Sequence, residues 1–202
     1  MPGYDKNSYV ATLHSDAQVL RARLKELLIE KSLRIAQNGE QFVLSSGQTS
    51  SHYFDGKKTT THPEGLFCVA RLIWDQVDDL EADAVGGPVI GADPIVAGVA
   101  LISQLMGHPL PCFMVRKESK GHGTRNRIEG AAIEGKRVVL IEDVITTGGS
   151  MLSAIQAVRE SGAEIVKIIA VIDREQGAVN TFGKGDMEFQ PLFTLSELLP
   201  TS

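Results

Sequence analysis

Two adjacent carboxylates beside a loop of small residues form the segment of this chain whose chemistry is clearest. Val138–Ile141 is a run of four apolar residues, which is typical of a strand buried on both faces of a parallel sheet. Glu142 and Asp143 follow it directly, and the apolar spacing further on predicts a helix to about Glu160. The loop between the acids and this helix consists of Val144, Ile145, Thr146, Thr147, Gly148, Gly149 and Ser150.

The loop has the properties of an anion site. Gly148 and Gly149 permit a tight turn that exposes backbone N–H groups, and Ser150 can cap the helix. The N-terminus of a helix favours negative charge, so we expect this loop to hold a phosphate group. Glu142 and Asp143 would repel a phosphate, and their natural partners are therefore hydroxyl groups or a divalent cation.

An acid pair next to a phosphate loop suits a ribose 5-phosphate, with the diol on the carboxylates and the phosphate in the loop. Neither of the two commoner phosphate motifs, Gly-x-Gly-x-x-Gly and Gly-x-x-x-x-Gly-Lys-Ser/Thr, occurs in the chain. The segment 138–150 resembles the signature of the type I phosphoribosyltransferases, which bind phosphoribosyl pyrophosphate (PRPP) in this way. The alternative is an ordinary strand–loop–helix joint with acids at the surface.

Two further segments follow predicted strands and could bind anions. Gly86–Pro94 is a glycine-rich loop whose backbone can approach a ligand closely, and the resemblance implies that it holds the pyrophosphate. Its alternative is a tight turn in which glycine serves geometry alone. Arg116–Arg127 carries five cations against one acid, which suggests an anionic ligand and a closing loop.

The second of these segments narrows the resemblance. Its pattern Arg-Lys-Glu-x-Lys-x-His-Gly is similar to the catalytic loop of the orotate phosphoribosyltransferases. The resemblance implies that Arg116, Lys117, Lys120 and His122 contact the pyrophosphate. It also implies a homodimer in which the loop's Lys and His reach the neighbouring subunit's site. The alternative is a solvated surface loop, because runs of charge are usually solvated.

Arg174 is the candidate for recognising the base. It lies just past a buried apolar strand, where a planar guanidinium can pair with a carboxylate. The segment Asp173–Gly177 resembles the Asp-Arg segment of the same family, whose Arg binds the orotate carboxylate or ring edge. A surface ion pair with Asp173 or Glu175 is the alternative.

The N-terminal part resembles the hood of the same enzymes over Leu44–Asp55, although a polar turn between short strands would also explain it. Many members have Lys where this chain has Ser45, and many place a Lys in the loop where this chain has Val89–Ala92. Lys57 or Lys58 could supply the missing charge, and the sequence does not choose between them. We expect a divergent branch of the family, with the resemblance covering residues from about 40 to 195.

The chain of 202 residues fits a single phosphoribosyltransferase domain, with an N-terminal helix and hood over about 1–60 and a core over about 61–202. Alternating strands and helices predict an α/β fold, an open parallel twisted sheet flanked by helices. In such sheets, ligands bind outside the carboxyl ends of the strands. The predicted strands are 42–44, 53–55, 84–89, 111–116, 138–144 and 165–173, and the predicted helices are 16–37, 63–79, 94–106 and 151–160.

Bulk properties restrict the class of partner and the compartment. A net charge of -5 argues against nucleic acid or an acidic membrane as the main partner. No apolar run is long enough for a membrane span, and the first residues lack a secretory pattern, so we expect a cytoplasmic protein. Cys68 and Cys112 lie in apolar contexts, which favours buried thiols.

The resemblance implies a pentosyltransferase that joins orotate to PRPP with Mg²⁺, in pyrimidine synthesis. It assigns 144–150 to the PRPP phosphate, with Thr146 also near the base, and Glu142 and Asp143 to the ribose hydroxyls. Lys120, His122 and Asp143 are the catalytic candidates, and Arg174 with Thr146 the orotate contacts. Two alternatives remain. The first is transfer to a purine or another base, and the presence of Arg174 argues against it. The second is a PRPP-sensing regulator that binds nucleic acid, and the net negative charge argues against it.

Overall fold

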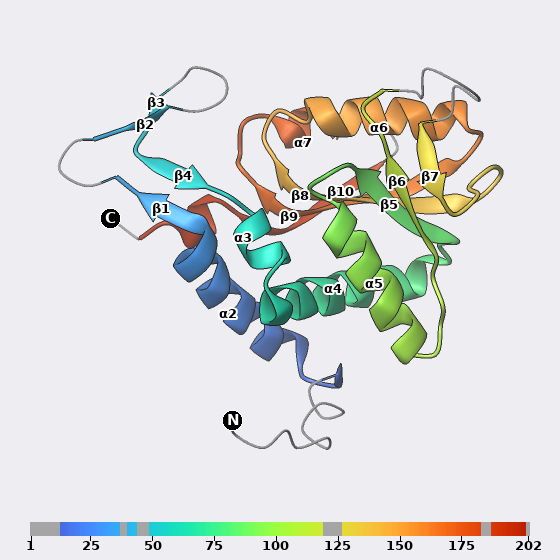
Figure 1. Cartoon of the computed structure of the whole chain (residues 1–202), viewed down its shortest axis with the longest axis horizontal. Helices are drawn as coiled ribbons and strands as arrows, with labels where there is room; N and C mark the ends of the chain where they lie inside the picture. Colours follow the sequence, from blue (N-terminus) through green and yellow to red (C-terminus); the bar gives the residue numbers. More distant parts are fainter. Residues whose placement is uncertain (1–12, 37–39, 44–48, 119–126, 183–186, 201–202) are drawn as a thin grey trace.

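A six-stranded sheet forms the centre of the molecule (Figure 1). The computed structural model describes residues 13–36, 40–43, 49–118, 127–182 and 187–200. Strand order across the sheet is β10-β9-β8-β5-β6-β7, and every neighbouring pair is parallel except β6 with β7. The strands are β5 (Ala84–Pro88), β6 (Cys112–Val115), β7 (Ile128–Gly130), β8 (Arg137–Ile145), β9 (Glu164–Asp173) and β10 (Glu188–Thr194).

Helices cover both faces of this sheet, so its central strands are apolar on both sides. Strand β8 shows the alternation: Val139 and Ile141 pack in the cluster with α2, α4 and α5, whereas Val138 and Leu140 pack with α6 and α7. This is why four consecutive apolar residues read as one buried strand. The helices are α2 (Ala17–Leu27), α4 (Pro63–Val77), α5 (Asp93–Leu105), α6 (Gly149–Glu160) and α7 (Ala178–Phe182).

The segment between α2 and α4 forms small sheets of its own, outside the main sheet (Figure 1). β1 (Leu33–Ile35) pairs antiparallel with β4 (His52–Phe54), and β2 (Phe42–Val43) with β3 (Thr49–Ser50). The four-residue helix α3 (Lys57–Thr60) leads from there to α4. We call the region of β1 to β4 the hood.

The predicted α/β sheet with flanking helices is confirmed, with three differences. The helix predicted for 16–37 ends in a π-helical turn, Leu28–Ser32, because the chain then pairs as β1 with β4. Strand β10 was not predicted, and Pro191 inside it is tolerated because β10 is an edge strand. Strand β7 was also missed and makes the sheet mixed rather than wholly parallel.

In the described part of the chain, no helix combines the length and the apolar character that crossing a membrane requires.

Candidate active site

The carboxyl ends of four parallel strands bring the predicted site segments together. β8 ends at Ile145, β5 at Pro88, β6 at Val115 and β9 at Asp173, and these strands are adjacent in the sheet. Because parallel strands end at one edge, the acid pair, the glycine loop after β5, the start of the cationic segment after β6 and Arg174 share that edge.

The acid pair is buried near the carboxyl end of β8. Glu142 is 7% exposed and Asp143 8% exposed. Burial raises the pKa of Glu142 to about 9, and the neighbouring Asp143 charge adds to the effect. Burial also raises the pKa of Asp143, which the positive charge of Lys57 opposes. In the ligand-free protein, the pair therefore retains a proton more readily than two exposed acids would.

Asp143 lies between glycines of two other segments. Its Oδ1 accepts a 2.8 Å hydrogen bond from the backbone N–H of Val144. A Cβ on Gly91 would stand 2.3 Å from Oδ1, and a Cβ on Gly56 would stand 3.4 Å from Oδ2 and 2.9 Å from Val144. The loop after β5 and the segment before α3 can therefore close on the carboxylate only because both residues lack a side chain.

The phosphate loop meets the start of α6. Gly148 has φ +89°, and a Cβ there would stand 2.6 Å from the ring of Phe182. α6 begins at Gly149 with Gly148 at the N-cap and without a side-chain cap, so the prediction that Ser150 caps the helix is wrong. Its first N–H groups are left for an anion. They face a small hollow of about 30 Å³ lined by Glu142, Val144, Ile145, Thr146, Gly148, Gly149, Ser150 and Met151.

The other candidate anion contacts come from the glycine loop after β5 and from the cationic segment after β6. Gly87 packs so closely on β8 that a Cβ would stand 2.0 Å from the carbonyl oxygen of Ile141. Lys117 lines a cavity of about 330 Å³ with Gly149 and Ser150, beside the phosphate loop. Arg116 instead forms an ion pair with Glu129 at 3.4 Å. Lys120 and His122 lie outside the described residues.

Arg174 presents a buried guanidinium without a hydrogen-bond partner among the described residues, at its Nε and Nη2. Its backbone N–H donates to the carbonyl oxygen of Ile145 at 2.8 Å, which places it next to the phosphate loop. Asp173 accepts instead from the backbone of Glu175, and the Glu175 carboxylate accepts from Ser196. The alternative of a local ion pair for Arg174 is therefore wrong. An unpaired buried guanidinium is costly, which fits a site awaiting an acidic ligand.

The structure adds three site residues that the sequence left unassigned. Lys57 forms an ion pair with Asp55 at 3.0 Å and lies 4.0 Å from Asp143. His52 lies on β4, and partial burial and the positive charge of Arg174 lower its pKa. Two of them carry partial signals in the sequence: Lys57 is one of two candidates for a missing charge, and Asp55 ends the segment that resembles the hood. His52 carries none, and it reaches the site through folding of the hood.

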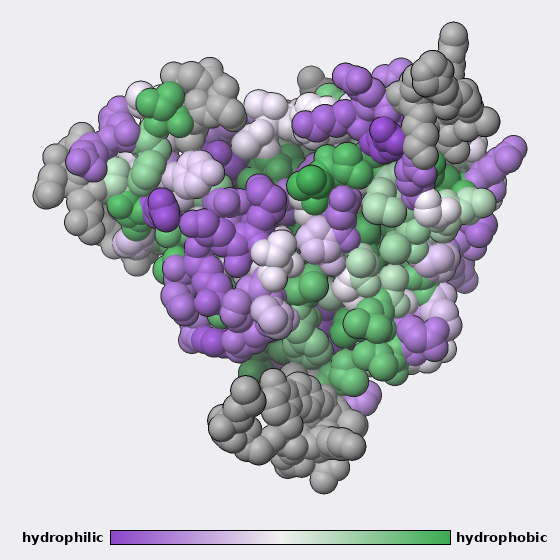
Figure 2. Space-filling model, viewed as in Figure 1, coloured by the Kyte–Doolittle hydropathy of each residue, from purple (hydrophilic) through white to green (hydrophobic). Residues whose placement is uncertain are grey.

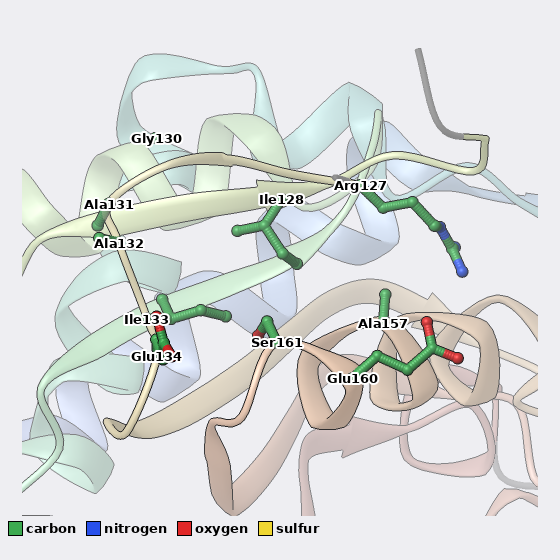
Figure 3. A pocket seen from close by; sticks show the side chains of 10 residues that line it. All are labelled: Arg127, Ile128, Gly130, Ala131, Ala132, Ile133, Glu134, Ala157, Glu160 and Ser161. Atoms are coloured by element: carbon green, nitrogen blue, oxygen red, sulfur yellow. The ribbon is translucent and has the colours of Figure 1, made fainter. Parts of the chain in front are cut away.

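A hollow larger than those at the strand ends lies elsewhere (Figure 3). It has a volume of about 710 Å³ and is formed by β7, the segment before β8 and the second half of α6. Small and apolar residues line it together with Arg127, Glu134 and Glu160. Its lining residues do not include Glu142, Asp143, Lys117 or Arg174. Size alone therefore does not identify the reactive region here. The strand ends do, because they combine convergent polar groups with shifted pKa values.

Within the part of the chain that the structure describes, no group of three or more His, Cys, Asp or Glu residues is arranged to hold a metal ion.

Comparison with known proteins agrees with this geometry. The model of the phosphoribosyl transferase domain matches residues 56–182. The orotate phosphoribosyltransferase of Aquifex aeolicus is 42% identical over 179 residues, 89% of this chain and 97% of that protein. That of Bradyrhizobium diazoefficiens is 43% identical over 183 residues, 89% of this chain and 96% of that protein.

Solved structures resemble the fold as well. The crystal structure of Mycobacterium tuberculosis orotate phosphoribosyltransferase in complex with PRPP superposes with a TM-score of 0.74 at 31% identity, covering 89% of this chain and 98% of that one. The matched region spans the acid pair, the phosphate loop and Arg174. The chain belongs to the phosphoribosyltransferase family, among the orotate phosphoribosyltransferases.

Proposed function

We propose that this protein transfers the 5-phosphoribosyl group of PRPP to orotate, which gives orotidine 5′-monophosphate and pyrophosphate in the synthesis of UMP. The observation that carries the proposal is Arg174. Its unpartnered guanidinium lies beyond β9, one backbone hydrogen bond from the strand that ends in the phosphate loop. A planar fork in that position suits the carboxylate of orotate, which purine bases lack.

The residues of β8 and its loop hold the sugar. The N–H groups of 147–150 and the start of α6 bind the 5-phosphate, and Thr146 stands between this loop and the base. Glu142 and Asp143 accept hydrogen bonds from the ribose hydroxyls. Binding a hydroxyl favours the ionised pair, so substrate binding releases the proton that burial retains.

Chemistry then proceeds without a protein nucleophile. The C1–O bond to pyrophosphate breaks as the orotate ring nitrogen attacks from the opposite face, and C1 gains positive character between them. The protein contributes positioning and stabilises the charge of the leaving group. Lys117 contacts the pyrophosphate in this proposal; it shares a cavity with Pro88, Gly149 and Ser150. In this proposal, Lys120 and His122 assist departure of pyrophosphate, and closure over the site excludes water.

Mg²⁺ is the cofactor in this proposal, carried by the substrate. In this proposal the ion would be held mainly by oxygens of the substrate. When bound there, the ion neutralises charge on the leaving pyrophosphate. Lys117 supplies further positive charge from the protein on that side.

A homodimer is also part of the proposal, with Lys120 and His122 reaching toward a partner's site. The outer face of α5 supports it: Leu101 is 62% exposed and Leu105 56% exposed, and Ile90 in the loop before α5 is exposed as well. Figure 2 shows hydrophobic surface over α5. Patches of this kind mark protein interfaces. Sedimentation equilibrium should report the mass of two chains, and a monomer would contradict this part.

The division into a hood over about 1–60 and a core over about 61–202 belongs to the same proposal, as does a cytoplasmic location.

The decisive experiment is a spectrophotometric assay of orotate consumption with PRPP and Mg²⁺, with adenine, hypoxanthine and uracil in parallel. We expect turnover with orotate alone. Turnover with another base would overturn the role of Arg174 and leave the PRPP site intact. PRPP binding without turnover on any base would favour a PRPP-sensing protein.

A further inference from the structure

The short segment between the hood and α4 is held in place by the end of α2 and the turn that follows it. Thr59 of α3 is fully buried, its Oγ1 lies 2.7 Å from Ser32 Oγ, and it donates to the carbonyl oxygen of Leu27 at 3.3 Å. Helix α3 therefore sits on the end of α2, between the hood and the edge of the sheet (Figure 1). The residues at the start of α3 are therefore held at a fixed position relative to β8.

Lys57 uses this position to reach the acid pair. Its Nζ lies 3.0 Å from Asp55 Oδ1 and 4.0 Å from Asp143 Oδ2, and its side chain is about half exposed. An ammonium group has three N–H donors, so the pair with Asp55 leaves others for a ligand or for Asp143. Oδ1 of Asp143 already accepts from Val144, which leaves Oδ2, the oxygen facing Lys57, for a hydroxyl.

Charge balance requires a cation at this place. Asp55, Glu142 and Asp143 stand together, and the proposed substrate brings several phosphate charges next to them. Lys57 and Lys117 are the cations whose charge lowers the pKa of Glu142. Lys117 lies across the site beside α6, so Lys57 is the cation on the hood side.

We propose that Lys57 is a positioning residue for PRPP: its ammonium group neutralises Asp143 so that this carboxylate can accept a ribose hydroxyl while the phosphates of the substrate lie nearby. The inference rests on the proposed function, because it takes PRPP as the ligand. It also decides between the two lysines that the sequence left open.

Lys58 is the matched control. It has the same charge and lies on the same short helix, yet it points into solvent and forms no ion pair among the described residues. A change at Lys58 alters the net charge of the protein as a change at Lys57 does, without touching Asp55 or Asp143.

The experiment compares Lys57→Met, Lys57→Arg and Lys58→Met with the wild type. Titration calorimetry gives the affinity for PRPP with Mg²⁺, and steady-state kinetics give KM for PRPP, KM for orotate and kcat. For Lys57→Met we expect PRPP affinity to fall at least about tenfold, the size of one partly buried charge interaction. The KM for orotate and kcat should stay within about threefold. Lys57→Arg should recover most of the affinity, and Lys58→Met should match the wild type.

Unchanged PRPP affinity in Lys57→Met would overturn the inference. So would an equal loss in Lys58→Met, which would indicate general electrostatics, or an equal rise in both KM values with a lower melting temperature, which would indicate a structural role. If Lys57→Met does not fold, Lys57→Gln is held to the same criteria. Calorimetry does not depend on turnover, so a wild type that binds PRPP and fails with orotate would contradict the proposed function alone.

Discussion

The strand ends of the core and the hairpins of the hood build the site in opposite ways. Glu142 and Asp143 stand on β8, which has a paired strand on each side and helices on both faces. The hood has strands of two or three residues, and its Val43 is 74% exposed. A two-stranded pair of that length has little stability of its own. The core can therefore fix atoms within the site, whereas the hood hairpins cannot.

This difference indicates which residues can hold polar side chains in a fixed position on the hood side of the site. Asp55 and Lys57 come after the last hood strand and are held by α3, whose Thr59 is buried against the end of α2. Contacts that need precision thus come from the core or from α3. The hairpins hold a ring pair of their own, Phe42 with Tyr53, at 5.9 Å between centroids. The predictions below test this division.

The largest effect should come from Arg174, on the core side. For Arg174→Ala we expect kcat/KM for orotate to fall by about 100-fold or more, because a desolvated charged hydrogen bond is lost. PRPP affinity should stay within about threefold. Arg159→Ala, at the exposed end of α6, is the control for loss of one positive charge. Steady-state kinetics check this, and a loss confined to PRPP would contradict the assignment.

A smaller effect should separate the core acid from the acid beside α3. We expect Asp143→Asn to weaken PRPP binding by about tenfold or more, since its carboxylate accepts a ribose hydroxyl. Asp55→Asn should cost about threefold, because Asp55 acts only through Lys57. Calorimetry with PRPP and Mg²⁺ measures both variants. Equal losses of PRPP affinity in the two variants would contradict the distinction between the core acid and the acid beside α3.

The smallest effect concerns stability. Burial raises the pKa of Glu142 from 4.5 to about 9, so the folded state binds the proton more tightly than the unfolded state. This favours folding below pH 4.5, and the advantage is lost as pH rises toward 9. Glu142→Gln should therefore raise the melting temperature at pH 8 by roughly 2–4 °C per kcal/mol gained and flatten its pH dependence. It should also weaken PRPP binding. Melting curves between pH 6 and 9 that show no effect of the substitution on the pH dependence would contradict this prediction, because a Glu142 ionised in both states contributes none.

The core could be predicted because the residues that indicate it are consecutive in the sequence. Val138–Ile141, the acids and the glycine loop are consecutive, and the sheet preserves that order as strand, site and helix. The position of Arg174 also followed from a local pattern, a polar residue directly after a buried strand. In each case, local sequence and final environment agree.

The rest depended on partners distant in the chain. Leu33–Ile35 continues the apolar spacing of α2, and only pairing with His52–Phe54 makes it a strand. β10 contains Pro191 and becomes a strand because it lines the edge of β9. Lys57 belongs to no motif and gains its role from Asp143, which lies far along the chain. The cap assigned to Ser150 failed because the helix begins at Gly149, two residues before the predicted start at Met151.

The hydrogen bond from the Arg174 amide to the Ile145 carbonyl fixes the distance between the ends of two neighbouring strands. It joins the end of β9 to the last residue of β8, so the two groups to which the proposed function assigns the ends of the nucleotide product have a spacing fixed by sheet register. A nucleotide lengthened by one methylene between sugar and phosphate could engage one of these groups or the other, but not both. Selection for the length of the molecule is thus built into the pairing of two strands.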